Sequence, residues 1–110
     1  TNYVHHRKIV RDGDAYTITD DVEGADRFAV RWRLAPEFDW RITSHGIVES
    51  RVPDGETVRV SLHCDQSDDW HMVLSESWES LYYGERTLCP TIEVTHIEGR
   101  FTTKFEPTGY

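Results

Sequence analysis

The sequence predicts an all-β protein, an antiparallel β-sandwich of about eight or nine short strands. Strand-forming residues alternate with polar ones over short runs, and turn signals recur roughly every 8 to 12 residues. No run of residues combines a helical apolar period with a cap. With 110 residues, the chain can bury about 60–70% of its unfolded surface around one core. We therefore expect residues 1–110 to form a single sandwich domain.

The first two strands are expected at Tyr3–Val10 and Ala15–Asp20, joined through the hairpin signal Asp12-Gly13. His5 and His6 are adjacent, so on a strand they point to opposite faces and cannot easily converge on one metal ion.

An acidic run follows at Asp20–Gly24. It lacks the alternating oxygen ligands and the terminal glutamate of a calcium loop. We interpret it as a solvated turn.

The clearest alternation lies between Arg27 and Leu34, and it predicts one apolar face for the core, formed by Phe28, Val30, Trp32 and Leu34. The opposite face presents a basic stripe, Arg27, Arg31 and Arg33. Arginine suits bidentate contacts with carboxylate or sulfate, which makes these three residues candidate glycan contacts. The commoner alternative is ion pairing with neighbouring acidic strands.

Three more strands are expected at Asp39–Ser44, Ile47–Val52 and Thr57–His63, with turns at His45-Gly46 and Pro53–Glu56. The next strand begins at Trp70, with Met72 and Leu74 in phase with it. The Trp70 ring is a candidate platform for a sugar, and packing in the core or at its rim is the alternative.

The closing segment, Glu76–Phe105, is expected to form the closing edge of the sandwich. Pro90 precedes a strand at Thr91–Ile97, in which His96 is in phase with the apolar face. A turn at Glu98-Gly99 leads to a last strand with its apolar face at Phe101, Thr103 and Phe105.

The net charge of −8 arises from 20 acidic and 12 basic residues, which disfavours binding to nucleic acid or to anionic membranes. No apolar run approaches the roughly 18 residues of a membrane helix, and no signal segment is present. Cys64 and Cys89 have no metal-binding spacing, so either two thiols or one disulfide is expected.

No spacing of histidines, serines or carboxylates predicts a catalytic set. The Gly-x-Ser-x-Gly elbow and a glycine-rich phosphate loop are both missing from the sequence. We expect no metal and no cofactor.

Several motifs resemble, in order, the C-terminal β-domain of the heparinase II/III-like polysaccharide lyases. The first are His-His-Arg within Val4–Val10, the Tyr16–Gly24 segment and Leu34-Ala35-Pro36. The last motif contains a tryptophan and a serine, then a Tyr-Tyr-Gly turn, a proline and a pair of threonines. Its residues are Trp78, Ser80, Tyr82, Tyr83, Gly84, Pro90, Thr102 and Thr103.

The resemblance implies a structural or accessory domain at the C-terminal end of a longer chain, and the start at Thr1 agrees with that expectation. In the family, an α/α toroid and a central β region cleave acidic, uronate-containing polysaccharides by β-elimination. Those regions would be the partners of this domain, and acidic polysaccharide a possible ligand. A periplasmic or secreted location is implied. No residue of this chain matches the catalytic or zinc motifs, so we expect the domain alone to be non-catalytic.

The alternative is an independent carbohydrate-binding or protein-interaction module. It would use exposed aromatic residues such as Trp40, Trp70 and Trp78, or the basic stripe.

Overall fold

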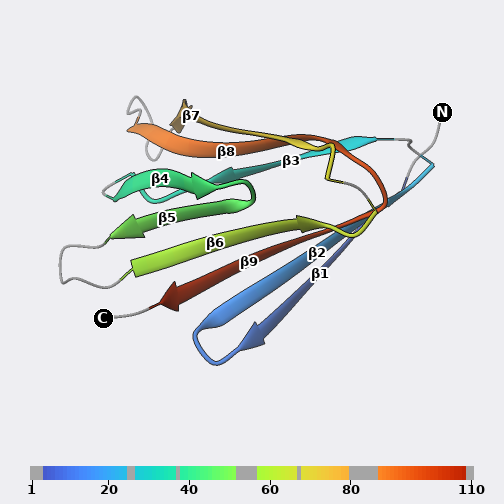
Figure 1. Ribbon diagram of the computed structural model, residues 1–110, viewed down its shortest axis with the longest axis horizontal. Helices are drawn as coiled ribbons and strands as arrows, with labels where there is room; N and C mark the ends of the chain where they lie inside the picture. Colours follow the sequence, from blue (N-terminus) through green and yellow to red (C-terminus); the bar gives the residue numbers. More distant parts are fainter. Residues whose placement is uncertain are drawn as a thin grey trace.

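The described part of the chain forms nine strands in two antiparallel sheets (Figure 1). The structure, a computed structural model, describes residues 4–24, 27–36, 38–51, 57–66, 68–79 and 87–108, without the side chains at 51, 77–79, 87 and 108. The strands are β1 (Val4–Asp12), β2 (Ala15–Glu23), β3 (Phe28–Arg33), β4 (Asp39–Ser44), β5 (Ile47–Arg51), β6 (Thr57–Cys64), β7 (His71–Glu79), β8 (Thr87–Ile97) and β9 (Arg100–Thr108). The predicted all-β sandwich is confirmed.

One sheet has six strands in the order β1-β2-β9-β6-β5-β4, and the other has three in the order β3-β8-β7. The smaller sheet covers part of the larger one. Figure 1 shows the β1–β2 hairpin spreading away from the three-stranded sheet toward the lower left. Within the described ranges, no helix is long and apolar enough to cross a membrane.

The core lies between the two sheets, where side chains with period two meet. The buried hydrophobic cluster is Val30, Leu34, Val48, Val60, Leu62, Cys64, Trp70, Ile92, Val94, Ile97 and Phe101. The predicted apolar face of β3 is confirmed, because Val30 and Leu34 are buried and Phe28 and Trp32 pack against the cluster.

Glycine permits three of the predicted turns, with φ of 61° at Gly13, 84° at Gly46 and 74° at Gly99. The predicted turn at Pro53–Glu56 lies outside the described residues.

We had expected the closing segment to form the edge of the sandwich, but only its first residues, in β7, belong to an edge strand. β9 lies between β2 and β6, and β8 lies between β3 and β7. Phe101 and Thr103 of β9 are fully buried. The edges of the larger sheet are β1 and β4.

The phase predicted for His96 is also wrong. Val30 pairs with Val94 and Phe28 with Ile97, so β8 has one extra residue at this point. His96 has φ of 63° and is exposed, whereas Ile97 is fully buried. Such a bulge reverses the alternation and turns the next residue inward.

The acidic run is part of a strand and not a solvated turn. Asp20 lies within β2 and is fully buried. Its position opposite Phe101 on β9 places the carboxylate on the core side of the sheet.

Both cysteines are buried thiols. The Cys64 thiol donates to the carbonyl oxygen of Glu98 at 3.1 Å.

Candidate functional site

Two of the three predicted basic-stripe residues are engaged in ion pairs. Arg27 Nε lies 3.2 Å from Glu98 Oε1, and Arg31 Nη2 lies 3.0 Å from Glu93 Oε2. Glu93 is directly opposite Arg31 on β8. The structure therefore shows, for these two residues, the ion pairing that was the alternative to glycan contact.

The remaining candidates differ from each other. Arg33 is exposed at the end of β3 and has no acidic partner among the described residues. Trp70 is only 4% exposed, and its ring packs against His45 and edge-on against Phe101. This burial favours the core-packing interpretation of Trp70, because neither face of its ring is open to a sugar.

The motif residues are only partly described. Pro90 lies in β8, and its carbonyl oxygen accepts from the Leu34 amide at 2.8 Å. Thr103 is buried and Thr102 half-buried in β9. For Trp78 only the backbone in β7 is described. The other members lie outside the described residues: Ser80, Tyr82, Tyr83 and Gly84.

A buried polar cluster, missed from the sequence, joins β1 to the core side of β2. Asp20 Oδ1 accepts from Arg7 Nε at 2.6 Å and lies 2.7 Å from His5 Nε2. Asp20 is fully buried, while the side chains of Arg7 and His5 are 38% and 42% exposed. Two cationic or donating groups on an edge strand therefore hold one enclosed carboxylate.

The same cluster links the two sheets. The guanidinium carbon of Arg7 lies 4.7 Å from the centre of the Trp32 ring, a cation–π geometry. Trp32 Nε1 donates to Thr103 Oγ1 at 3.2 Å. Asp20 Oδ2 has no hydrogen-bond partner among the described residues. Because these contacts connect the two sheets, we assign the cluster a structural role.

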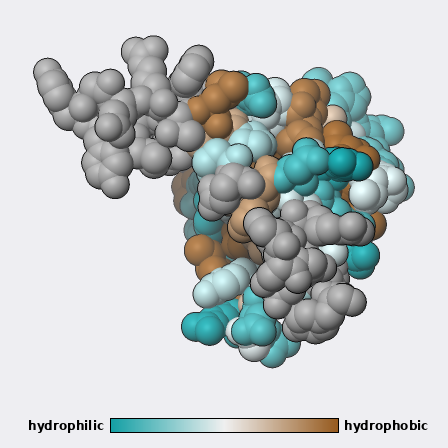
Figure 2. Space-filling view, turned by 90° about the vertical axis from the view of Figure 1, so that its left-hand side faces the viewer, coloured by the Kyte–Doolittle hydropathy of each residue, from teal (hydrophilic) through white to brown (hydrophobic). Residues whose placement is uncertain are grey.

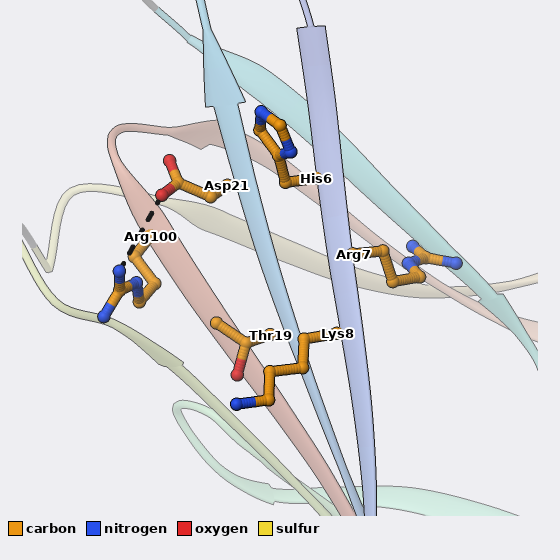
Figure 3. A pocket seen from close by; sticks show the side chains of 6 residues that line it. All are labelled: His6, Arg7, Lys8, Thr19, Asp21 and Arg100. Atoms are coloured by element: carbon orange, nitrogen blue, oxygen red, sulfur yellow. Dashed lines mark ion pairs between the residues drawn. The ribbon is translucent and has the colours of Figure 1, made fainter.

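A second feature missed from the sequence is a surface cavity of about 340 Å³ on the outer face of β1, β2 and β9 (Figure 3). Its polar lining comes from His6 and Lys8 of β1, Thr19 and Asp21 of β2, and Arg100 of β9. Arg7 also borders it, but Figure 3 shows this side chain pointing away, toward the opposite side of β1.

The cavity combines three side chains that can be cationic with one acid. Arg100 Nη2 lies 3.9 Å from Asp21 Oδ2, and His6 Nε2 lies 3.9 Å from Glu23 Oε2. Both separations are at the long end for ion pairs. The sequence offered no signal for this site, because Arg100 reaches it only through the pairing of β9 with β2.

A second hollow, of about 300 Å³, lies between the sheets at the end where β4 begins. Figure 2 views the molecule from that end and shows hydrophobic side chains at the surface among hydrophilic ones. The lining residues come from β4, β7, β8 and the β3–β4 connection: Pro36, Phe38, Asp39, Trp40, Leu74, Ser75, Glu76, Leu88 and Pro90. Trp40 is half-buried, and its indole donates to the Ala35 carbonyl at 2.9 Å.

In the described ranges, no three histidine, cysteine, aspartate or glutamate residues are grouped so that they could hold a metal ion. The candidate site is the cavity on β1, β2 and β9.

Comparison with solved structures places this fold inside much larger lyases. A mutant of the heparan sulfate lyase HepC from Pedobacter heparinus matches 99% of this chain with a TM-score of 0.82 and 14% sequence identity. The heparinase III BT4657 gene product matches in two structures. The one with methylated lysines covers 100% of the chain with a TM-score of 0.80, and the other covers 97% with a TM-score of 0.76, both at 16% identity.

The chain shares its fold with one part of these lyases. It spans only 18% of the length of each matched chain. No protein-family model matches the sequence, and no curated protein matches it either. The resemblance seen in the sequence motifs is thus confirmed at the level of the fold.

Proposed function

We propose that this chain is an accessory β-sandwich, at the C-terminal end of a heparinase II/III-like polysaccharide lyase, and that it is not catalytic alone. The observation that supports this function is the match of nearly the whole chain to a small part of each lyase. In the full-length enzyme, β-elimination of acidic, uronate-containing glycans belongs to the remainder of the chain. A fold alone does not define an activity, so the proposal depends on tests of the site and the surface.

An uncovered inner face on the β1–β2 hairpin supports the accessory role. Ile9 pairs with Ile18, which is buried, so both side chains lie on the core side of the sheet. Tyr16 lies on that same side, two residues before Ile18. Yet Ile9 is 62% and Tyr16 43% exposed.

The exposure follows from the unequal sheets, because the hairpin extends beyond the three-stranded sheet (Figure 1). We propose that the catalytic toroid and central β region of the parent chain cover this face. The lyases matched are more than five times longer than this segment, which leaves enough chain for such a partner.

The non-catalytic role is tested by incubating the chain with heparin, heparan sulfate, chondroitin, hyaluronan and alginate. We expect no ultraviolet absorbance from an unsaturated uronate. Appearance of that chromophore in proportion to protein concentration would contradict the accessory function.

The partner surface is tested with the double variant Ile9→Thr/Tyr16→Thr. We expect the unmodified chain to bind a hydrophobic dye and to self-associate in sedimentation experiments, and the variant to do so less. Val73→Thr is the matched control, because Val73 is 56% exposed on β7, away from the hairpin. A monomeric chain with no dye binding would instead favour an independent module.

A further inference from the structure

We propose that the cavity on the outer face of β1, β2 and β9 is an oxyanion site, in which Lys8, Arg100 and Thr19 bind a sulfate or carboxylate group. We assign the anion to an acidic glycan, and only that choice of source rests on the proposed function. The site itself follows from the geometry of the strands.

Strand register brings the binding groups together. Lys8 is directly opposite Thr19, and Asp21 is opposite both His6 on β1 and Arg100 on β9. Directly opposite residues in an antiparallel sheet have Cβ atoms about 4.5–5.5 Å apart on one face. Two adjacent rows across the sheet therefore place an ammonium, a hydroxyl and a guanidinium around one space (Figure 3).

The donors in this space are largely unused. Lys8 is exposed and has no hydrogen bond or ion pair with any residue that the structure describes. Arg100 has five N–H donors, and its ion pair with Asp21 is long at 3.9 Å. Among the lining residues that the structure describes, Asp21 is the single acid. An oxyanion could thus receive donors from Lys8 and Arg100 without displacing a short ion pair.

Two of the three arginines of the basic stripe are less available to an anion than Lys8 and Arg100. Arg27 and Arg31 have acidic partners at 3.2 and 3.0 Å, so an anion would compete with nearby carboxylates. The cavity also includes His6, which adds a positive charge when protonated. The chain as a whole has a net charge of −8, so it repels a polyanion over most of its surface. A local excess of cations therefore favours the binding of a single anionic group at this cavity.

The ligand chemistry follows from the donors. A guanidinium binds two oxygens of one carboxylate or sulfate in a planar, bidentate geometry, and an ammonium acts as a point charge. The Thr19 hydroxyl can donate to a third oxygen. These groups fit a sulfate ester or a uronate carboxylate, and equally a free inorganic anion.

The test is a titration of the isotope-labelled chain, followed by nuclear magnetic resonance at constant ionic strength. The probes are sodium sulfate, sodium acetate, a heparan sulfate oligosaccharide and the same oligosaccharide without sulfate. Sodium chloride serves as the reference. We expect saturable shifts of the Thr19, Asp21 and Arg100 amides with sulfate, and tighter binding of the sulfated oligosaccharide.

The variant Lys8→Gln/Arg100→Gln should bind sulfate about tenfold more weakly, equivalent to about 1.4 kcal/mol. The control Arg31→Gln/Arg33→Gln removes the same charge from the opposite sheet and should bind as the unmodified chain does. Saturable binding of inorganic sulfate without preference for the oligosaccharide would support the site and assign it to a free anion.

The site is overturned if no probe gives saturable shifts, or if both double variants weaken binding equally. Loss limited to the Arg31/Arg33 variant would also overturn it. The chromophore and self-association experiments do not depend on Lys8 or Arg100, so the site and the accessory function can fail separately.

Discussion

Arg7 Nε lies 2.6 Å from Asp20 Oδ1 and connects the edge strand β1 to a carboxylate that is fully buried. The two residues are directly opposite each other in the register of β1 and β2. Their exposures differ, with 38% for Arg7 and 0% for Asp20. Removal of Arg7 and removal of the Asp20 charge should therefore change the free energy of unfolding by different amounts.

Arg7→Met should lower the free energy of unfolding more than Asp20→Asn does. The first leaves a buried carboxylate with only His5 beside it, which costs about 3 kcal/mol. The second leaves a guanidinium that already reaches water and keeps an acceptor oxygen, at a cost of about 1 kcal/mol. Urea unfolding curves measure both.

The control for this comparison is Arg41→Met. Arg41 Nη2 lies 3.0 Å from Asp39 Oδ2, and the two side chains are 77% and 75% exposed. We expect a change within about 0.5 kcal/mol. Equal losses from Arg7→Met and Arg41→Met would show that burial of Asp20 does not determine the strength of its pair.

Gly46→Ala should destabilise the fold strongly. A Cβ at Gly46 would lie 2.7 Å from the Leu62 carbonyl oxygen, whose residue donates its amide to Gly46. The φ of 84° adds the cost of a left-handed alanine, about 1–2 kcal/mol. We expect a total loss of about 3 kcal/mol in thermal or urea unfolding.

Gly13→Ala separates the two contributions. Gly13 has φ of 61°, but a Cβ there would meet nothing within 4 Å. Only the backbone cost of about 1 kcal/mol should remain. If both glycine variants lost the same stability, the close contact with Leu62 would be irrelevant.

His96→Gly should raise the free energy of unfolding by about 0.5 kcal/mol. Glycine relieves the left-handed backbone at φ of 63°, and this gain exceeds the entropy cost of a more flexible unfolded chain. Its neighbour Thr95 lies in the same strand without positive φ, so Thr95→Gly should instead cost about 1 kcal/mol. A loss from both changes would contradict strain at the bulge.

Both cysteines should resist a thiol reagent in the folded protein, because Cys64 is 2% and Cys89 0% exposed. After unfolding in urea without reductant, two thiols per chain should react. Detection of fewer than two would indicate a disulfide. Mass spectrometry of the alkylated chain provides the same count independently.

Much of the local structure could be predicted because alternation has a period of two and turns need particular residues. The inward face of β3 and the glycine turns at Gly13, Gly46 and Gly99 followed from these short-range rules. The bulge at His96 could not be predicted in this way, because the extra residue is not marked by any particular residue type. It is visible only in the pairing of β8 with β3.

The candidate site could not be predicted from the sequence. Arginines on one strand were visible as the β3 stripe, yet Glu93 and Glu98 are the partners that occupy two of them. Lys8 and Arg100 are far apart in the sequence. They come close only because β2 pairs with β1 on one side and with β9 on the other. For Trp70 the sequence left a sugar platform and core packing as alternatives, and its burial against His45 and Phe101 decided between them.

The sequence by itself determined the all-β class, most strand faces and the turns at Gly13, Gly46 and Gly99, because each depends on neighbours within a few residues. The tertiary structure alone decided that β9 is an inner strand, that Asp20 is enclosed, and that Lys8 shares a cavity with Arg100. These features depend on which strands pair and in what register. Strand pairing depends on how the whole core is buried, so it cannot be deduced from any single segment of the sequence.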